Sequence, residues 1–126
     1  MGLEHEELTG RIIGAAITVH KELGPGFIES VYENALIVEL RNQRIEFKSQ
    51  LAVPILYRGV EVGLHRLDLF VQEQIVVELK AQSMLSNIHF VIVRSYLRAV
   101  QREHGLLLNF AKQTLETKRV MVREFT

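Results

Sequence analysis

Apolar residues recur at three- and four-residue intervals from Leu8 to Leu40, which is the spacing of one helix face. The first set with this spacing is Leu8, Ile12, Ala16, Val19 and Leu23. It predicts an amphipathic helix that ends at Gly24, Pro25 and Gly26. The second set is Ile28, Val31, Tyr32, Ala35, Leu36 and Leu40. It predicts a second helix that frays near Arg41–Arg44.

After Ile45 the pattern changes to short apolar runs, which are typical of β-strands. The runs are Leu51–Tyr57, Val60–Leu64, Leu67–Val71 and Ile75–Leu79. Turns are expected at Arg58-Gly59 and at Gln72–Gln74. Pro54 has no N–H to donate to a ladder, so its strand is expected at a sheet edge or with a bulge.

Helical spacing returns from about Asn87 to Glu103, and Gly105 is expected to end this helix. Its inward face is formed by Val93, Tyr96, Leu97 and Val100. Two short strands are expected after it, at Leu106–Phe110 and Arg119–Val122. The order of two helices, three or four strands, a helix and two strands predicts an α/β layer protein with a mixed sheet.

The composition is that of one globular domain over residues 1–126, with 48% apolar and 24% charged residues. The chain has no cysteine, which excludes disulfides, thiolate metal sites and a cysteine nucleophile. The acidic start MGLEHEELTG does not resemble a signal peptide, and no apolar run approaches the length of a membrane span. We therefore expect a soluble cytoplasmic protein without a membrane partner.

The net charge is zero, because Lys plus Arg and Asp plus Glu both number 15. Nucleic-acid binding would therefore need a local basic patch. Arg94, Arg98 and Arg102 are spaced four apart, so a helix would align them as one ridge that could contact phosphates. The alternative is an ordinary solvated helix face.

Three charged residues interrupt the expected hairpin of residues 66–81. If the strands pair about a turn near Glu73, the numbers of facing residues sum to about 146 and Asp68 lies opposite Glu78. Glu78 and Lys80 then share a face. The other face is apolar and consists of Leu67, Leu69, Val71, Ile75, Val77 and Leu79. Facing carboxylates repel, so either a divalent cation lies between them or Lys80 pairs with both in a salt-bridge network.

An Asp on one strand and Glu-x-Lys on the next, here Asp68 and Glu78-Leu79-Lys80, resembles the signature of the PD-(D/E)XK nuclease superfamily. The segment GFIESVY, from Gly26 to Tyr32, is similar to the motif of the GxxExxY protein family, a small branch of that superfamily. The segments VHKELGP, RLD, VVELKA, SYL and GLLLNF also resemble that family. The resemblance covers nearly the whole chain.

The resemblance implies a restriction-endonuclease-like, three-layer core with a central mixed β-sheet flanked by helices. It also implies a nuclease that hydrolyses DNA or RNA with Mg²⁺ or Mn²⁺. By that resemblance Asp68 and Glu78 are the metal ligands, Lys80 is the catalytic lysine that positions the attacking water, and Glu29 is a helix glutamate that adds to the site. Tyr96 in the third helix is expected to face the site and contact substrate. So small a monomer offers little surface for holding a duplex, which is compatible with a homodimer.

Two positions depart from that family's pattern. Ile92 stands where relatives usually have Gln, four residues ahead of Tyr96, and Phe90 stands where an acidic residue is expected. An apolar side chain there removes a hydrogen-bond partner for metal-bound water or substrate. The alternative function is therefore a nucleic-acid- or protein-binding module that keeps the fold with weak or no catalysis.

Several candidates also have structural interpretations. Glu29 could cap the start of its helix. Tyr32 is expected to bury its ring with its hydroxyl hydrogen-bonded. His20 and His89 lack metal-ligand spacing and are expected to be structural.

Overall fold

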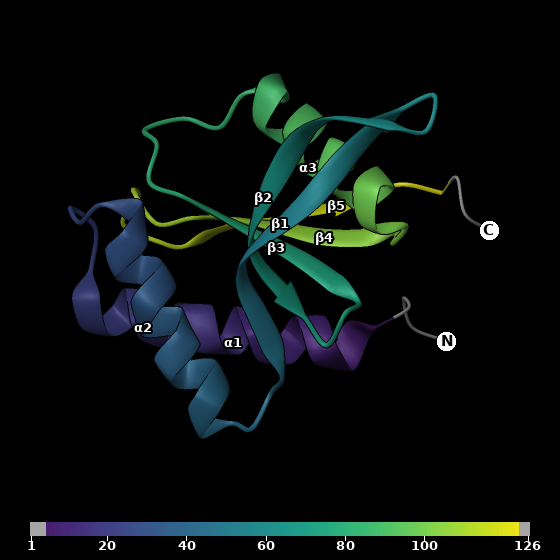
Figure 1. The fold of residues 1–126 in the computed structure, drawn as a ribbon. Coiled ribbons are helices and arrows are strands. Elements are labelled where there is room, and N and C mark those ends of the chain that lie inside the picture. The colour runs from purple at the N-terminus through teal and green to yellow at the C-terminus, as the bar shows by residue number, and fades with distance from the viewer. Residues whose placement is uncertain (1–4, 124–126) are drawn as a thin grey trace.

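The computed structural model describes residues 5–123, which form three helices and five strands (Figure 1). The elements are α1 Glu6–Leu23, α2 Glu29–Asn42, β1 Phe47–Tyr57, β2 Val60–Val71, β3 Ile75–Lys80, α3 Asn87–Val100, β4 His104–Asn109 and β5 Glu116–Met121. The predicted order of helices and strands is confirmed. The two runs Val60–Leu64 and Leu67–Val71 belong to one long strand, β2.

The strands form one mixed sheet in the order β1-β2-β3-β4-β5. All neighbours are antiparallel except β3 and β4, which run parallel and are connected through α3. Helices α1 and α2 cover one face of the sheet and α3 covers the other (Figure 1). The predicted restriction-endonuclease-like, three-layer arrangement with a central mixed sheet is confirmed.

Each face of the sheet has its own buried core. The core under α1 and α2 includes Ile12, Ala16, Leu36, Leu69, Val77 and Phe110, whereas the core under α3 includes Leu67, Phe70, Val76, Val93 and Leu97. Strand β3 is buried from Ile75 to Leu79 because helices cover both of its faces. The apolar runs of the sequence therefore become central strands.

Strand β2 changes its packing near Asp68. The prediction that Leu67 shares a face with Leu69 and Val71 is wrong, because Leu67 packs with Phe70 in the core under α3. Strict alternation of faces holds along a flat strand, whereas a strongly twisted strand rotates its side chains relative to the layers around it. Asp68 consequently lies where the strand passes from one core to the other.

The edge strand β1 has both features expected from Pro54. It pairs only with β2 among the described strands, and its ladder shifts register between Ile55 and Leu56. None of the helices within residues 5–123 has the length and apolar character needed to cross a membrane.

Candidate active site

The β2–β3 hairpin brings Asp68 close to the backbone of β3. The predicted register is confirmed by the pairs Leu69–Val77 and Val71–Ile75. Beyond that ladder, the N–H of Leu79 donates to Asp68 Oδ2 at 3.0 Å. The carboxylate therefore takes the place of a backbone acceptor at the end of the ladder, which fixes its position at the surface of the sheet.

Glu78 lies in β3 and is only 6% exposed. Its Oε2 is 3.8 Å from Lys80 Nζ, but its Oε1 is buried and has no hydrogen-bond partner. Burial, and then the neighbouring Asp68 carboxylate, raise the pKa of Glu78 from 4.5 to about 8. Burial also raises the pKa of Asp68, although hydrogen bonds from Leu79 and Gln50 and the charge of Lys80 oppose the rise. The carboxylate pair is therefore short of positive charge.

The side chain of Glu29 reaches from the first turn of α2 to the end of β3. The N–H of Ala81 donates to Glu29 Oε2 at 3.3 Å, next to Lys80 in the chain. Glu29 lies in the first turn of α2, where the alternative interpretation places a capping or dipole role, but its hydrogen bond is made with Ala81. Glu29 instead joins the helix to the strand that carries Glu78 and Lys80.

Two further residues belong to this cluster and were missed from the sequence. Gln50 Nε2 donates to both carboxylate oxygens of Glu33 at 2.9 Å and lies 3.3 Å from Asp68 Oδ1. Burial raises the pKa of Glu33, and the carboxylates of Asp68 and Glu29 raise it further. Glu33 follows Glu29 by one helical turn, so helix spacing alone could have identified it.

Helix α3 places Tyr96 near the acids from the opposite side. Burial, followed by the charges of Glu78 and Asp68, raises the pKa of Tyr96 to about 12, so its phenol keeps its proton. Its ring packs edge-on against His65, at 4.7 Å between centroids. Ile92, one turn earlier, is half-buried.

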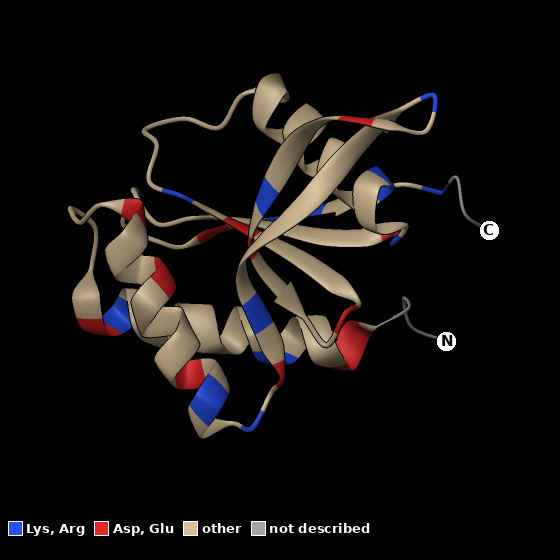
Figure 2. Cartoon of the chain, viewed as in Figure 1, with Lys and Arg blue, Asp and Glu red and all other residues tan. Residues whose placement is uncertain are grey.

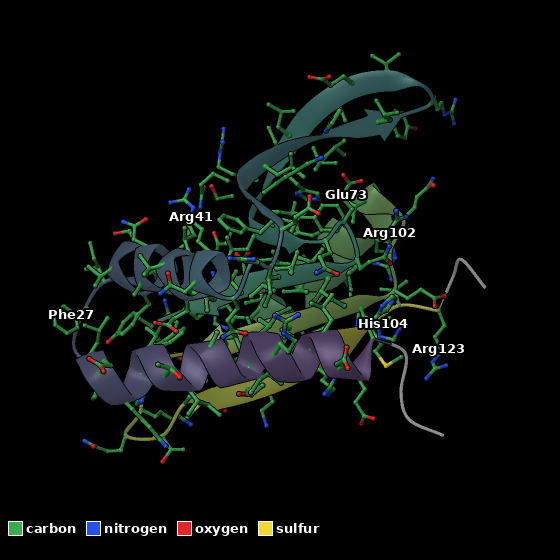
Figure 3. All side chains as sticks on the ribbon, turned by 90° about the horizontal axis from the view of Figure 1, so that it is seen from below. Phe27, Arg41, Glu73, Arg102, His104 and Arg123 are labelled. Atoms are coloured by element: carbon green, nitrogen blue, oxygen red, sulfur yellow. The ribbon has the colours of Figure 1, made fainter. Side chains whose placement is uncertain are left out.

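The basic ridge predicted on this helix is shorter than expected. Helix α3 ends at Val100, because Gln101 adopts a left-handed conformation with φ 57°. Arg102 lies beyond the helix, and its Nε donates to the carbonyl of Glu73 at 2.7 Å (Figure 3). It lines a separate cavity of about 550 Å³ that Asp68 and Glu78 do not line. The prediction of one helical ridge is therefore wrong for Arg102.

The structural interpretations of three other residues are confirmed. The Tyr32 hydroxyl donates to the carbonyl of Gly24 at 2.6 Å and the ring is fully buried. His20 Nε2 lies 2.8 Å from the carbonyl of Lys112, and the N–H of Ser86 donates to His89 Nδ1 at the start of α3.

The donor set of this cluster suits a hard divalent cation. Within residues 5–123 no group of three or more His, Cys, Asp or Glu side chains is arranged to hold a metal ion. Mg²⁺, however, commonly takes one or two protein carboxylates and completes its shell with water and phosphate. The buried Glu78 Oε1 without a partner is an atom that such an ion would satisfy. Asp68 and Glu78 therefore fit the ion in chemistry.

Positive charge is not concentrated on one face of the molecule. Figure 2 shows Lys and Arg interspersed with Asp and Glu along the helices and strands. This distribution agrees with the net charge of zero. Any contact with phosphates would depend on a few local side chains.

Residues 6–120 match the family model described as the PD-(D/E)XK nuclease superfamily. The chain belongs to this superfamily. PD-(D/E)XK nucleases generally use divalent metals. Asp68 lies in β2 and the Glu78-Leu79-Lys80 segment in the neighbouring strand β3, in the same order as the D and the (D/E)XK in the name of the superfamily.

A solved structure described as a crystal structure of SSO0001 has a similar fold. The TM-score is 0.58 at 14% sequence identity, over 93% of this chain and 59% of the other. The PD-(D/E)XK chain thus spans less than two thirds of the length of that protein, and the likeness extends to the fold alone. No curated protein matches the sequence.

Proposed function

We propose that the chain is a nuclease that hydrolyses phosphodiester bonds in DNA or RNA, with Mg²⁺ or Mn²⁺ held by Asp68 and Glu78. The observation that carries this proposal is the buried Glu78 Oε1, which has no hydrogen-bond partner and lies beside a second carboxylate. A buried carboxyl oxygen without a partner destabilises a fold, so its presence calls for a functional reason.

The bound ion would polarise the phosphate and lower the pKa of an attacking water. Lys80 lies next to this position, with Nζ 3.8 Å from Glu78 and its side chain 20% exposed. Its role is to orient the attacking water and to neutralise charge on the phosphate. Glu29, joined to Ala81, would hold a ligand water at the same end of β3. Tyr96 would donate its phenolic hydrogen to substrate.

We further propose that the chain is a member of the GxxExxY branch. Gly26, Glu29 and Tyr32 match the motif of that branch. The buried Tyr32 hydroxyl donates to Gly24, and the N–H of Phe27 donates to that hydroxyl at 3.2 Å. The motif therefore has a physical purpose here: its Tyr secures the loop from which α2 begins, and α2 presents Glu29 to the site.

Arg94 and Arg98 on α3 are the remaining candidates for contacts with the phosphate backbone. They follow each other by one turn on the helix that also carries Tyr96. Substrate grip is expected to depend on salt concentration through such residues.

The second candidate function is a binding module on the same fold. The observation that favours it is Ile92, which leaves an apolar side chain one turn from Tyr96 where a polar partner would support metal-bound water. Phe90 has a structural explanation, because it packs against the core under α3.

The test is Mn²⁺- and Mg²⁺-dependent cleavage of single-stranded DNA, duplex DNA and RNA. Glu78→Gln keeps the shape of the side chain and serves as the blank. Lys80→Met is expected to lose at least ~10²-fold in rate, the usual scale for one positioned charge or proton-transfer group.

Lys48→Met is the matched control, because Lys48 pairs with Glu73 on the surface and lines the cavity that Asp68 and Glu78 do not line. It is expected to cleave like the wild type. A wild-type rate equal to that of Glu78→Gln on all three substrates would refute the nuclease proposal and favour the binding module.

A further inference from the structure

Gln50 has an unusual backbone conformation for a residue inside a strand. Its φ is 51°, in the left-handed region that residues with a side chain seldom adopt. The β1–β2 ladder pairs Ser49 with Leu69 and Leu51 with Leu67, yet the intervening Gln50 and Asp68 are not paired. The carbonyl of Gln50 instead accepts from Arg66 at 3.1 Å. Such a conformation persists only where its surroundings hold it, and it is often found near functional groups.

In this conformation the side chain of Gln50 points toward the carboxylates of Glu33 and Asp68. Its Nε2 lies 2.9 Å from each carboxylate oxygen of Glu33 and 3.3 Å from Asp68 Oδ1. The other oxygen of Asp68 accepts from the N–H of Leu79 at 3.0 Å. Both oxygens of Asp68 are thus held, one by the backbone of β3 and one by an amide from β1.

The chemistry of an amide suits this place. An amide donates to two carboxylates without adding positive charge, so the negative charge that attracts a divalent cation is kept. A Lys or Arg at position 50 would neutralise the acids and compete with the cation. Without a donor from Gln50, Glu33 and Asp68 would repel each other directly, and Asp68 would keep the hydrogen bond from Leu79 on Oδ2 but lose the one on Oδ1.

We propose that Gln50 is a positioning residue, whose amide holds the Asp68 carboxylate in the orientation that binds the divalent cation and separates it from Glu33. This inference rests on the proposed function, because it presumes that Asp68 binds the ion. Removal of the outer partner of a metal ligand typically lowers metal affinity by ~10 to 100-fold. We therefore expect the Kd for Mn²⁺ to be about tenfold higher without the Gln50 amide.

Two substitutions distinguish the effect of the side-chain amide from the effect of the strained backbone conformation. Gln50→Met keeps the length of the side chain and the strained backbone but removes the donor. Gln50→Gly removes the donor and also relieves the strain, since glycine adopts a positive φ freely. The Gly variant is expected to melt roughly 3 °C above the Met variant. If the amide positions Asp68, both variants lose the same Mn²⁺ affinity despite their different melting temperatures.

The measurement is Mn²⁺ binding by calorimetry at one pH, on the folded wild type, both Gln50 variants and Asp68→Asn. Wild-type affinity in both Gln50 variants, with binding lost in Asp68→Asn, would overturn the inference and leave the metal site intact. Wild-type affinity in the Gly variant alone would assign the effect to the backbone and also overturn it. If the wild type itself binds no Mn²⁺, the proposed function fails and this inference fails with it.

Discussion

Replacing Glu78 with Gln is expected to remove an unusual pH dependence from the stability of the metal-free protein. Burial and the Asp68 carboxylate raise the pKa of Glu78 to about 8 in the native state, against 4.5 for an exposed glutamate. The native state therefore binds this proton more tightly than the unfolded chain does. The free energy of unfolding must then fall as the pH rises from about 4.5 to about 8.

The size of this effect follows from the separation of the two pKa values. Each pH unit between them changes the free energy of unfolding by up to about 1.4 kcal/mol. Over the window from 4.5 to about 8, the upper limit is about 5 kcal/mol. Gln is neutral at every pH, so the side chain at position 78 adds no pH dependence to the free energy of unfolding of the Gln variant. Near pH 5 the two proteins should have similar stability, and above pH 8 the Gln variant should be the more stable by several kcal/mol.

The assay is urea denaturation of both proteins at several pH values from 5 to 8.5, with a chelator present to remove divalent ions. Groups away from the site titrate alike in both proteins, so the difference between the two stability curves reports Glu78 together with its coupling to Asp68. Parallel curves over this range would refute the reasoning, because they would mean that Glu78 ionises in the folded protein as easily as in water.

Three other predictions concern residues outside the carboxylate pair. Ile92→Gln is expected to increase metal-dependent cleavage by up to ~10-fold, because it supplies a polar group one turn from Tyr96; equal initial rates of the two proteins would contradict this. Tyr32→Phe is expected to lower the free energy of unfolding in urea by about 1–3 kcal/mol, since the carbonyl of Gly24 loses its buried donor. Arg94→Gln is expected to weaken nucleic-acid binding and to reduce the slope of log K against log salt by about 0.9, provided that Arg94 contacts a phosphate; titrations at several salt concentrations measure it.

The hairpin register could be predicted because two apolar runs flank a short polar turn. A turn centred near Glu73 sets which residues face each other, and the observed pairs agree with it. The edge position of Pro54 was predictable for a similar reason, since a missing N–H excludes the residue from a central ladder.

Other features depended on geometry that no local pattern encodes. Leu67 was assigned to the wrong face because β2 passes from one buried core to the other near Asp68, which the spacing of apolar residues does not reveal. The end of α3 depends on the left-handed Gln101, whereas the sequence suggested Gly105 as the stop. Gln50 could not be found at all, because its contacts arise from a single backbone angle in β1.

The carboxylates of Asp68 and Glu78 differ in their hydrogen bonds to the rest of the fold. This difference affects which of them would be replaced first if the site lost its function. Asp68 accepts the N–H of Leu79, so a related chain without nuclease activity would still benefit from an acceptor at that position. Glu78 has a buried oxygen with no partner, so selection for stability alone would replace it early. In a set of related chains, the identity of the residue at position 78 should therefore distinguish catalytically active from inactive members better than the identity of the residue at position 68.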